Sequence, residues 1–362
     1  MSIPNWILEM KSNGFNSFYQ IVDENECYYC PDAKNYVPIP RSDKTLTFSM
    51  AKAKGGLIRK GWSASLVDLG DKIAAIELHS VLKEDLNPID GSIMETFKFA
   101  IDWTEENGYK GLVISGDGKN FSAGANLNMI LDFAERKDWD GIENVIDLMQ
   151  SLMQELRFAP FPVVSAPFGL VLGGGYETIG ATDRIVAAAE SYIGLVEVGV
   201  GLIPGAGGNL RMISRLTKKI QTMVPGAFPI IQKAFETIGY AKVSFSAKQA
   251  KSHGYLSDDD IIIVNRDHLL SKAKDVALEM SEGYKAPEME TFKLPGTSGR
   301  LAITTMVKGL VKTKKISEHD ALIANKLSHV LTGGDKGGPF SPVDEQYLLD
   351  IEREAFISLC GE

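Results

Sequence analysis

Two glutamates stand beside glycine-rich turns in otherwise apolar surroundings. Glu177 ends the stretch "LGGGYE" at 172–177, and Glu197 lies within "GLVEVGVGLIPGAGG" at 194–208. Two carboxylates in a dry pocket titrate as a coupled pair, so one can carry a proton while the other stays ionised. That division suits general acid and base catalysis. Taken singly, either glutamate also fits a helix N-terminal charge or a structural hydrogen-bond acceptor.

Glycine-rich stretches of this kind can present bare backbone N–H groups to a ligand. A third stretch, "NFSAGANL" at 120–127, also places glycine next to small apolar residues after a predicted strand. Two such N–H groups can form an oxyanion hole, which stabilises negative charge on a carbonyl oxygen. Dinucleotide binding fits less well, because "GVGLIPG" carries Pro204 where the third glycine of that motif belongs. Tight packing of a helix on a sheet is the alternative for any single stretch.

The elements around these stretches alternate between short apolar runs and helical patterns. We predict strands at 72–78, 111–117, 162–167 and 184–190, and helices at 92–108 and 145–158. This order is typical of an α/β fold with helices packed on a mainly parallel sheet, which builds its sites at strand ends.

The last ~75 residues read as helical by the same periodicity rules. Ser317 and Asp320 predict a capping box, and Gly333 closes that helix. The helix carries one apolar stripe, made of Ile323, Leu327, Val330 and Leu331. We expect it to pack against its own domain or a sister subunit.

The first ~45 residues are aromatic-rich and read as irregular, with a linker at 36–45. The three cysteines, Cys27, Cys30 and Cys360, are too few for a disulfide framework and fit a reducing compartment. No second Cys or His pair follows "CYYC" at zinc spacing, so no metal is expected. No secretory signal is visible, which favours a cytoplasmic location.

The bulk properties limit the partners. The chain has 362 residues and a formal net charge of -9, with 44% hydrophobic residues. This composition is that of an ordinary globular protein, and the negative charge argues against nucleic acid or an acidic membrane surface as partner.

The blocks "NFSAGANL", "PFGLVLGGGYETIGATDRIVAA" and "IGLVEVGVGLIPGAGG" resemble, in the same order, the signatures of the crotonase (enoyl-CoA hydratase/isomerase) superfamily. The resemblance covers about Ser63 to Leu256. It implies an α/β fold, a crotonase-like spiral of ββα units with a helical C-terminal region. It also implies a homo-trimer or hexamer and an acyl-CoA thioester as substrate, without a metal or redox cofactor.

The resemblance also assigns the site residues. It places the oxyanion donors at the backbone N–H groups of Ala125 and Gly174, and the paired acids of the hydratases at Glu177 and Glu197. Retention of both acids favours enoyl-CoA hydration within fatty-acid β-oxidation. The alternatives are Δ3,Δ2-enoyl-CoA isomerisation, which can work with one carboxylate, and a catalytically silent acyl-CoA-binding or assembly module.

Three further positions are assigned to substrate binding. Ala123 and Gly124 match the loop that meets the CoA adenine, and Gly205 matches a turn that lines the water and acyl pocket. CoA arrives with the substrate and is not a resident cofactor.

The flanking segments resemble a branch in which the hydratase follows a 3-hydroxyacyl-CoA dehydrogenase. We predict three parts: 1–45, which resembles the tail of such a dehydrogenase, the hydratase core 46–285, and a helical region 286–362. The dinucleotide-binding part is absent, which fits a fragment of a longer protein or a chain that begins at an added methionine, and we expect no NAD binding by this chain alone.

Overall fold

A seven-stranded sheet forms the centre of the computed structural model, which describes residues 3–23, 25–40, 42, 44–81, 83 and 85–361. The strand order is β12-β10-β8-β7-β6-β5-β4. The strands are β4 (Leu57–Lys60), β5 (Ala64–Asp68), β6 (Ile73–Leu78), β7 (Gly111–Ser115), β8 (Val163–Ser165), β10 (Arg184–Ala188) and β12 (Ile261–Ile263). Pairing is parallel from β6 to β12 and antiparallel from β4 to β6. The predicted mainly parallel sheet is confirmed.

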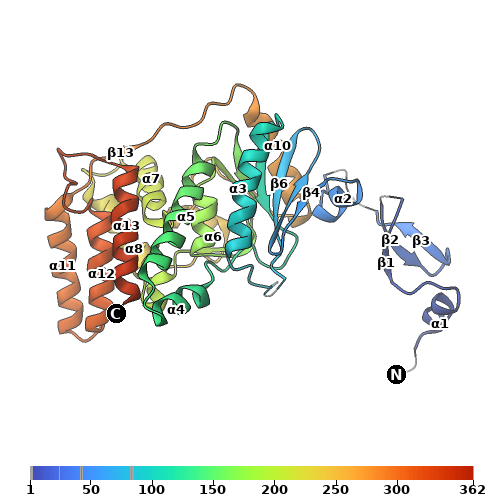
Figure 1. Cartoon of the computed structure of the whole chain (residues 1–362), viewed down its shortest axis with the longest axis horizontal. Helices are drawn as coiled ribbons and strands as arrows, with labels where there is room; N and C mark the ends of the chain where they lie inside the picture. Colours follow the sequence, from blue (N-terminus) through green and yellow to red (C-terminus); the bar gives the residue numbers. More distant parts are fainter. Residues whose placement is uncertain are drawn as a thin grey trace.

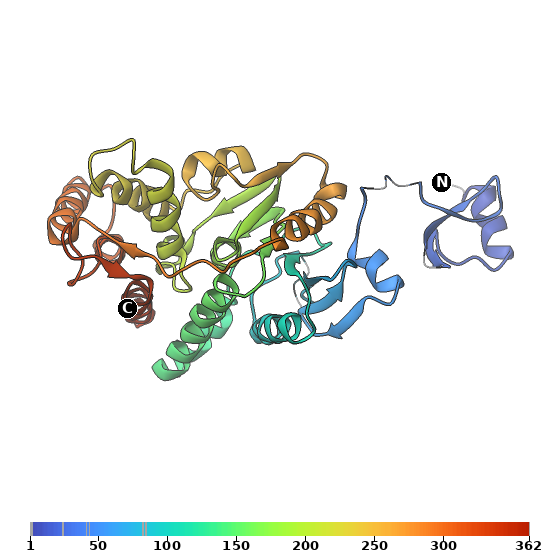
Figure 2. The same cartoon turned by 90° about the horizontal axis from the view of Figure 1, so that it is seen from above.

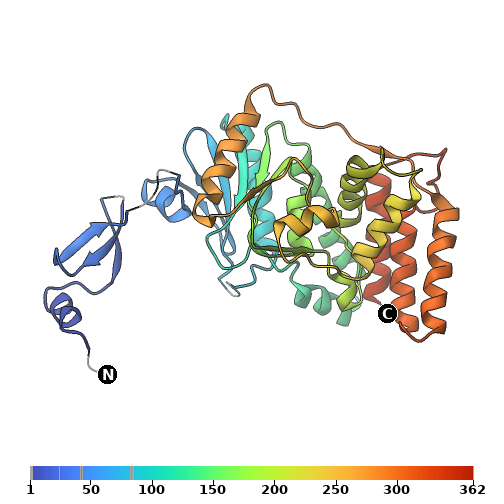
Figure 3. The same cartoon turned by 180° about the vertical axis from the view of Figure 1, so that it is seen from behind.

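Helices cover both faces of this sheet. α3 (Gly91–Glu106) packs on β5, β6 and β7, and α10 (Leu269–Ser281) packs on β6, β7, β8 and β10. α3 lies in front of the sheet in Figure 1, and α10 lies in front of it in Figure 3. Because of this double cover, every residue of β6 and β7 is buried. Their continuous apolar sequence is therefore what a doubly covered strand requires.

Two successive ββα-type units carry two of the glycine-rich stretches, 172–177 and 194–208. Their elements after the main-sheet strands are β9 (Gly169–Leu172), α6 (Gly174–Gly180), β11 (Ser191–Gly194), the 3-10 helix η1 (Glu197–Val200) and α7 (Gly208–Ile220). β9 and β11 pair in parallel, with Leu172 opposite Gly194. The N–H of Gly173 also donates to the carbonyl of Gly194 at 2.9 Å. The segments that leave these two strands therefore start side by side.

Three long helices close the C-terminal side of the body (Figures 1 and 2), as predicted. They are α11 (Gly296–Lys312), α12 (Glu318–Leu331) and α13 (Glu345–Cys360). The Ser317–Asp320 capping box is present at the start of α12. Its apolar stripe is at most 1% exposed, because α12 packs against α7, α8 (Phe228–Gly239), α11 and α13 of the same chain. The stripe therefore faces its own chain and not a neighbour.

The remaining elements connect these layers. They are α2 (Phe48–Ala53), α4 (Leu127–Glu135), α5 (Trp139–Arg157), α9 (Ala247–His253), η2 (Arg266–His268), β13 (Thr291–Phe292) and β14 (Val343–Asp344). After α10 an extended segment crosses the body to β13 (Figure 2), which pairs with β14 just before α13. Among the described residues, no helix has the length and apolar character needed to span a bilayer.

The N-terminal segment is ordered, so the prediction of irregular structure there is wrong. α1 (Asn5–Ser12) precedes an antiparallel sheet of β1 (Tyr19–Val22), β2 (Asn25–Cys30) and β3 (Asn35–Pro38). Alternation along β2 buries Cys27 and Tyr29 at 3% and 5% exposure, and the ring of Phe15 stacks on Tyr29 with centroids 5.1 Å apart. This small aromatic core orders the segment. Arg41 and Asp43 of the predicted linker lie outside the described residues.

Candidate active site

One cavity of about 100 Å³, the site cavity, collects every residue that the sequence singled out. These seven residues are Ala123, Gly124, Ala125, Gly174, Glu177, Glu197 and Gly205. The rest of the wall is almost entirely apolar, with Met149 from α5 and Phe356 from α13 among its members. The structure thus brings three separate glycine-rich stretches to one place: β9 and β11 pair in parallel, and Ser122 of the third stretch pairs with Val171 of β9.

Glu177 lies in the first turn of α6 and is 4% exposed. Its Oε1 accepts the N–H groups of Ala206 at 2.7 Å and Gly208 at 2.9 Å. A Cβ at position 208 would stand 3.0 Å from that oxygen, so glycine lets the backbone approach the carboxylate. Burial raises the pKa of Glu177 to about 7, and the N–H donors oppose the shift. The carboxyl can therefore exchange a proton near neutral pH.

Glu197 opens η1 on the other side of the site cavity. A Cβ on Gly173, whose φ is +51°, would stand 3.0 Å from Oε1 of Glu197, so glycine is needed there too. Oε2 is shielded from solvent and has no hydrogen-bond partner among the described residues. Burial raises the pKa of Glu197 well above its usual range, and the charge of Glu177 raises it further. The arrangement thus favours an ionised Glu177 and a protonated Glu197.

Two neighbouring backbone donors stand free beside these acids. Within the described part of the chain, no acceptor receives the N–H of Ala125 or of Gly174. Gly174 is the first residue of α6, where a helix leaves its N–H groups unpaired. A Cβ on Gly174 would lie 3.3 Å from the nitrogen of Ala125, so the two backbones are in contact. Such a pair of donors can hold an oxygen on which negative charge develops.

The sequence analysis missed two residues of this region, both on α13. Glu352 is fully buried and accepts the N–H of Gly207 at 2.6 Å and of Asn209 at 3.1 Å. Phe356, one turn later, packs its ring so closely on Gly205 that a Cβ there would meet it at 2.7 Å. A signal existed: the apolar face of this helix carries the acids Glu345 and Glu352, and acids on a buried helix face call for an explanation.

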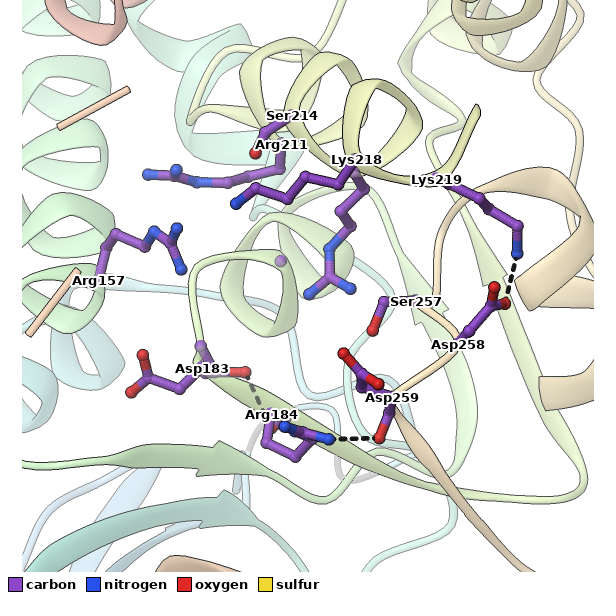
Figure 4. Close-up of a pocket in the computed structure, with 13 residues that line it drawn as sticks. Arg157, Asp183, Arg184, Arg211, Ser214, Lys218, Lys219, Ser257, Asp258 and Asp259 are labelled. Carbon is purple, nitrogen blue, oxygen red and sulfur yellow. Dashed lines mark hydrogen bonds and ion pairs between the residues drawn. The ribbon is translucent and has the colours of Figure 1, made fainter. Parts of the chain in front are cut away.

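A second concavity, the basic hollow, lies near the other ends of α6 and α7 (Figure 4) and measures about 390 Å³. Its cations are Arg157, Arg184, Arg211, Arg215, Lys218 and Lys219. Glu290 pairs with two of them, Arg157 and Lys218, and Glu345 pairs with Arg211. Arg215 pairs with Asp260, Lys219 pairs with Asp258, and Arg184 donates to the carbonyl of Asp259. Every one of these cations thus has an acceptor.

The comparisons with known proteins agree with this geometry. The pattern of the family described as enoyl-CoA hydratase/isomerase matches residues 69–286, more than half of the chain. A Bacillus subtilis protein named a probable 3-hydroxyacyl-CoA dehydrogenase is 41% identical over 362 residues, which cover 99% of this chain and 44% of that protein. A putative fatty acid oxidation complex trifunctional enzyme from Rickettsia prowazekii is 27% identical over 281 residues, 77% of this chain and 35% of that protein. The chain thus spans less than half the length of these two relatives.

The fold has matches among solved structures as well. The crystal structure of enoyl-CoA hydratase from Bacillus halodurans superposes with a TM-score of 0.55 over 83% of this chain and 96% of that one, at 18% identity. At this identity the likeness concerns the fold alone. It agrees with the spiral of ββα units and the helical C-terminal region described above.

Proposed function

Because the chain belongs to the enoyl-CoA hydratase/isomerase family, we propose that it adds water to trans-2-enoyl-CoA thioesters and yields 3-hydroxyacyl-CoA. The observation that carries this choice is the pair of acids in one cavity. Glu177 and Glu197 both line it, and their environments separate their protonation states. Isomerisation needs one carboxylate, whereas hydration uses one group to take a proton from water and another to give one to carbon.

The free N–H groups of Ala125 and Gly174 bind the thioester oxygen in this mechanism. They stabilise the charge that this oxygen gains when water attacks the β-carbon, at about 2.7–4 kcal/mol per donor by analogy with other oxyanion holes. Ionised Glu177 takes the proton of the attacking water, and the new C–O bond forms at the β-carbon. The electrons of the double bond move toward the thioester, and Glu197 delivers its proton to the α-carbon. A proton then returns from Glu177 to Glu197 to restore the resting state.

The size of the site cavity supports a short acyl group. Its volume of about 100 Å³ is smaller than the cavity of about 150 Å³ that holds a benzene ring in a well-studied engineered protein. A four-carbon enoyl group is a suitable first substrate. We assign Ala123 and Gly124 to the adenine end of CoA and Gly205 to the wall of the water and acyl pocket.

The experiment that tests the function is direct. Crotonyl-CoA is incubated with the purified chain, and loss of the enoyl thioester absorbance is followed together with the formation of 3-hydroxybutyryl-CoA. A 3-enoyl-CoA offered in parallel tests isomerisation. Formation of 2-enoyl-CoA from it, with no hydration of crotonyl-CoA, would replace our assignment with the isomerase. Binding of acyl-CoA without turnover of either thioester would point to a silent binding module.

We propose that in the whole protein this hydratase acts in β-oxidation beside a 3-hydroxyacyl-CoA dehydrogenase, with 1–45 as the tail of that domain, 46–285 as the hydratase core and 286–362 as the helical region. The names of the two relatives support this placement. The dehydrogenase part would bind NAD, and we expect this chain alone to show no micromolar NAD affinity in calorimetry.

We also propose a cytoplasmic homo-trimer or hexamer. The free cysteines support a reducing compartment. On α11, Leu301 and Met306 are 65% and 37% exposed and offer an apolar contact. Light scattering at micromolar concentration tests the assembly, and a strict monomer would contradict it.

A further inference from the structure

Segment 206–209, which leads into α7, divides its four N–H groups between two carboxylates. The first and third residues donate to Oε1 of Glu177, at 2.7 and 2.9 Å. The second and fourth donate to Glu352, at 2.6 and 3.1 Å. The segment is thus held from both sides, by α6 and by α13. Any shift of the Glu352 bonds moves the donors that fix Glu177.

Glu352 differs from an ordinary buried acid because no cation compensates it. In the described part of the chain it is held by N–H groups alone, those of the segment and, at 3.5 Å, the amide of Gln150. Gln150 also donates to the carbonyls of Gly205 and Leu349, so it ties α5 to the same turn. Burying an unpaired carboxylate is costly, and a neutral amide oxygen could accept the same kind of bond.

The same helix contains a matched acid with a different environment. Glu345 is also fully buried, two turns earlier on α13, but it pairs with Arg211 at 3.3 Å. It also accepts the amide of Gln154 at 3.2 Å and the N–H of Glu290 at 3.0 Å. Glu345 therefore docks α13 onto the body with a compensated charge, whereas Glu352 bonds the same helix to the turn at 207–209 without a cation partner in the described residues.

The charged groups around α13 leave Glu352 facing the site acids. Arg211 of α7 pairs with Glu345, and Arg353 pairs with Asp147 and Glu143 of α5 and donates to Oε1 of Gln150 at 2.9 Å. His329 of α12 lies against Arg300, and Asp344 of β14 caps the helix. Burial and then the charge of Glu177 raise the pKa of Glu352 to about 8, and the charge of Glu352 contributes to the raised pKa of Glu197.

We propose that Glu352 is a positioning residue of the hydratase site, which aims Glu177 through segment 206–209 and, once it ionises on the alkaline side, adds a negative charge that opposes ionisation of Glu197. The inference rests on the proposed hydratase function. Glu352 does not touch the substrate; it acts through the backbone turn and through its charge. A misplacement of about 1 Å at a catalytic group can cost roughly 10²-fold in rate. A residue that fixes this turn can therefore have a large effect on the rate.

The test compares Glu352→Gln with Glu345→Gln in the full chain, using crotonyl-CoA. We expect Glu352→Gln to lower kcat at least about 10-fold with little change in KM, because the amide keeps one acceptor oxygen but turns an NH2 group toward the other N–H of the turn. We also expect the alkaline limb of its kcat/KM profile to move to lower pH. Without the charge of Glu352, Glu197 loses its proton more easily, and a protonated Glu197 is what the reaction needs.

Glu345→Gln is the matched control, since it removes a buried acid from the same helix face. We expect it to lower the unfolding temperature but to leave the alkaline limb in place. Glu352→Asp separates geometry from charge: it should lose rate like Glu352→Gln while the alkaline limb stays near that of the wild type.

A second measurement does not depend on catalysis. Amide hydrogen exchange across 206–209 should be at least about 10-fold faster in Glu352→Gln than in Glu345→Gln, because an amide keeps one acceptor oxygen and one of the donors at 207 and 209 loses its buried acceptor. Wild-type kcat and an unmoved alkaline limb in Glu352→Gln would overturn the positioning role, although hydration itself would stand. A wild-type chain without hydratase activity would overturn the proposed function instead. If the wild-type chain is inactive, the exchange measurement still tests whether Glu352 holds segment 206–209. Unchanged exchange in Glu352→Gln would overturn that role, and faster exchange would support it.

Discussion

The site cavity and the basic hollow share two helices, α5 and α6, and they differ in how their charges are compensated. Gly174 and Glu177 of α6 line the cavity, whereas Gly180 at the end of that helix lines the hollow. The hollow is the larger, about 390 against about 100 Å³. Five of its six cations pair with an acid and Arg184 donates to a backbone carbonyl, whereas the acids at the cavity have N–H donors or, for Oε2 of Glu197, no partner among the described residues. Uncompensated buried charge, rather than volume, therefore marks the place for chemistry.

The largest expected effect tests the acids of the cavity. Glu177→Gln and Glu197→Gln should each lower crotonyl-CoA hydration by at least about 10²-fold, because an amide keeps the shape of the side chain but exchanges no proton near neutral pH. The double substitution should cost far less than the product of the two, since both acids serve one transition state.

The control for those variants comes from the basic hollow. Lys218→Gln, on the exposed side of α7, should change hydration by less than about 2-fold, because its ion pair with Glu290 is at the surface. Near-full activity of Glu197→Gln, or a loss in Lys218→Gln as large as in the acids, would contradict the distinction between the two regions.

A substitution in the basic hollow should change the free energy of unfolding more than the rate of hydration. Arg211→Met leaves Glu345 buried without its cation, and breaking a buried pair in this way costs about 3–5 kcal/mol. Denaturant unfolding should show this loss. Hydration per folded molecule, measured well below the unfolding transition, should stay within about 3-fold of the wild type. A large drop in kcat with unchanged stability would assign catalysis to the hollow.

The pH dependence sharpens the description of the cavity. Glu177 must be ionised to act as the base, and its pKa is raised to about 7, so kcat/KM should rise about tenfold per pH unit below neutrality. The fall on the alkaline side follows the loss of the proton of Glu197, whose pKa burial and the charge of Glu177 hold well above its usual range. Initial rates over pH 5 to 10 give both limbs. A flat profile between about pH 5 and 7 would exclude Glu177 as the base.

The smallest expected effect concerns the cavity wall. Phe356→Leu should raise kcat/KM for a six-carbon enoyl-CoA relative to crotonyl-CoA by up to about 10-fold, because removing ring volume makes room for extra methylenes. Competition between the two thioesters measures the ratio directly. An unchanged ratio would mean that the acyl chain runs elsewhere.

Local patterns predicted four of the seven strands of the main sheet (β6, β7, β8 and β10), the Ser317–Asp320 cap and the turns that deliver Glu177 and Glu197. These features depend on neighbours in sequence, such as glycines at the ends of short apolar runs. Glu352 was not predicted, because its meaning depends on N–H groups 143 and 145 residues away. The N-terminal sheet was missed for a related reason, since its order comes from ring contacts across strands and not from a long apolar run. The roles of the site residues stay predictions until the variants are measured.

The clamp on segment 206–209 also has a consequence for the order in which the protein is made. A nascent chain emerges from the ribosome at ≈ 5–20 residues per second, so Glu177 and the turn it holds are available well before α13 exists. Until α13 is made, the turn that binds Glu177 would lack the two hydrogen bonds to Glu352, and the cavity would lack the wall formed by Phe356. Catalytic competence would therefore appear late and abruptly, when the helix docks, and a ribosome stalled before residue 345 should display a folded sheet without hydratase turnover.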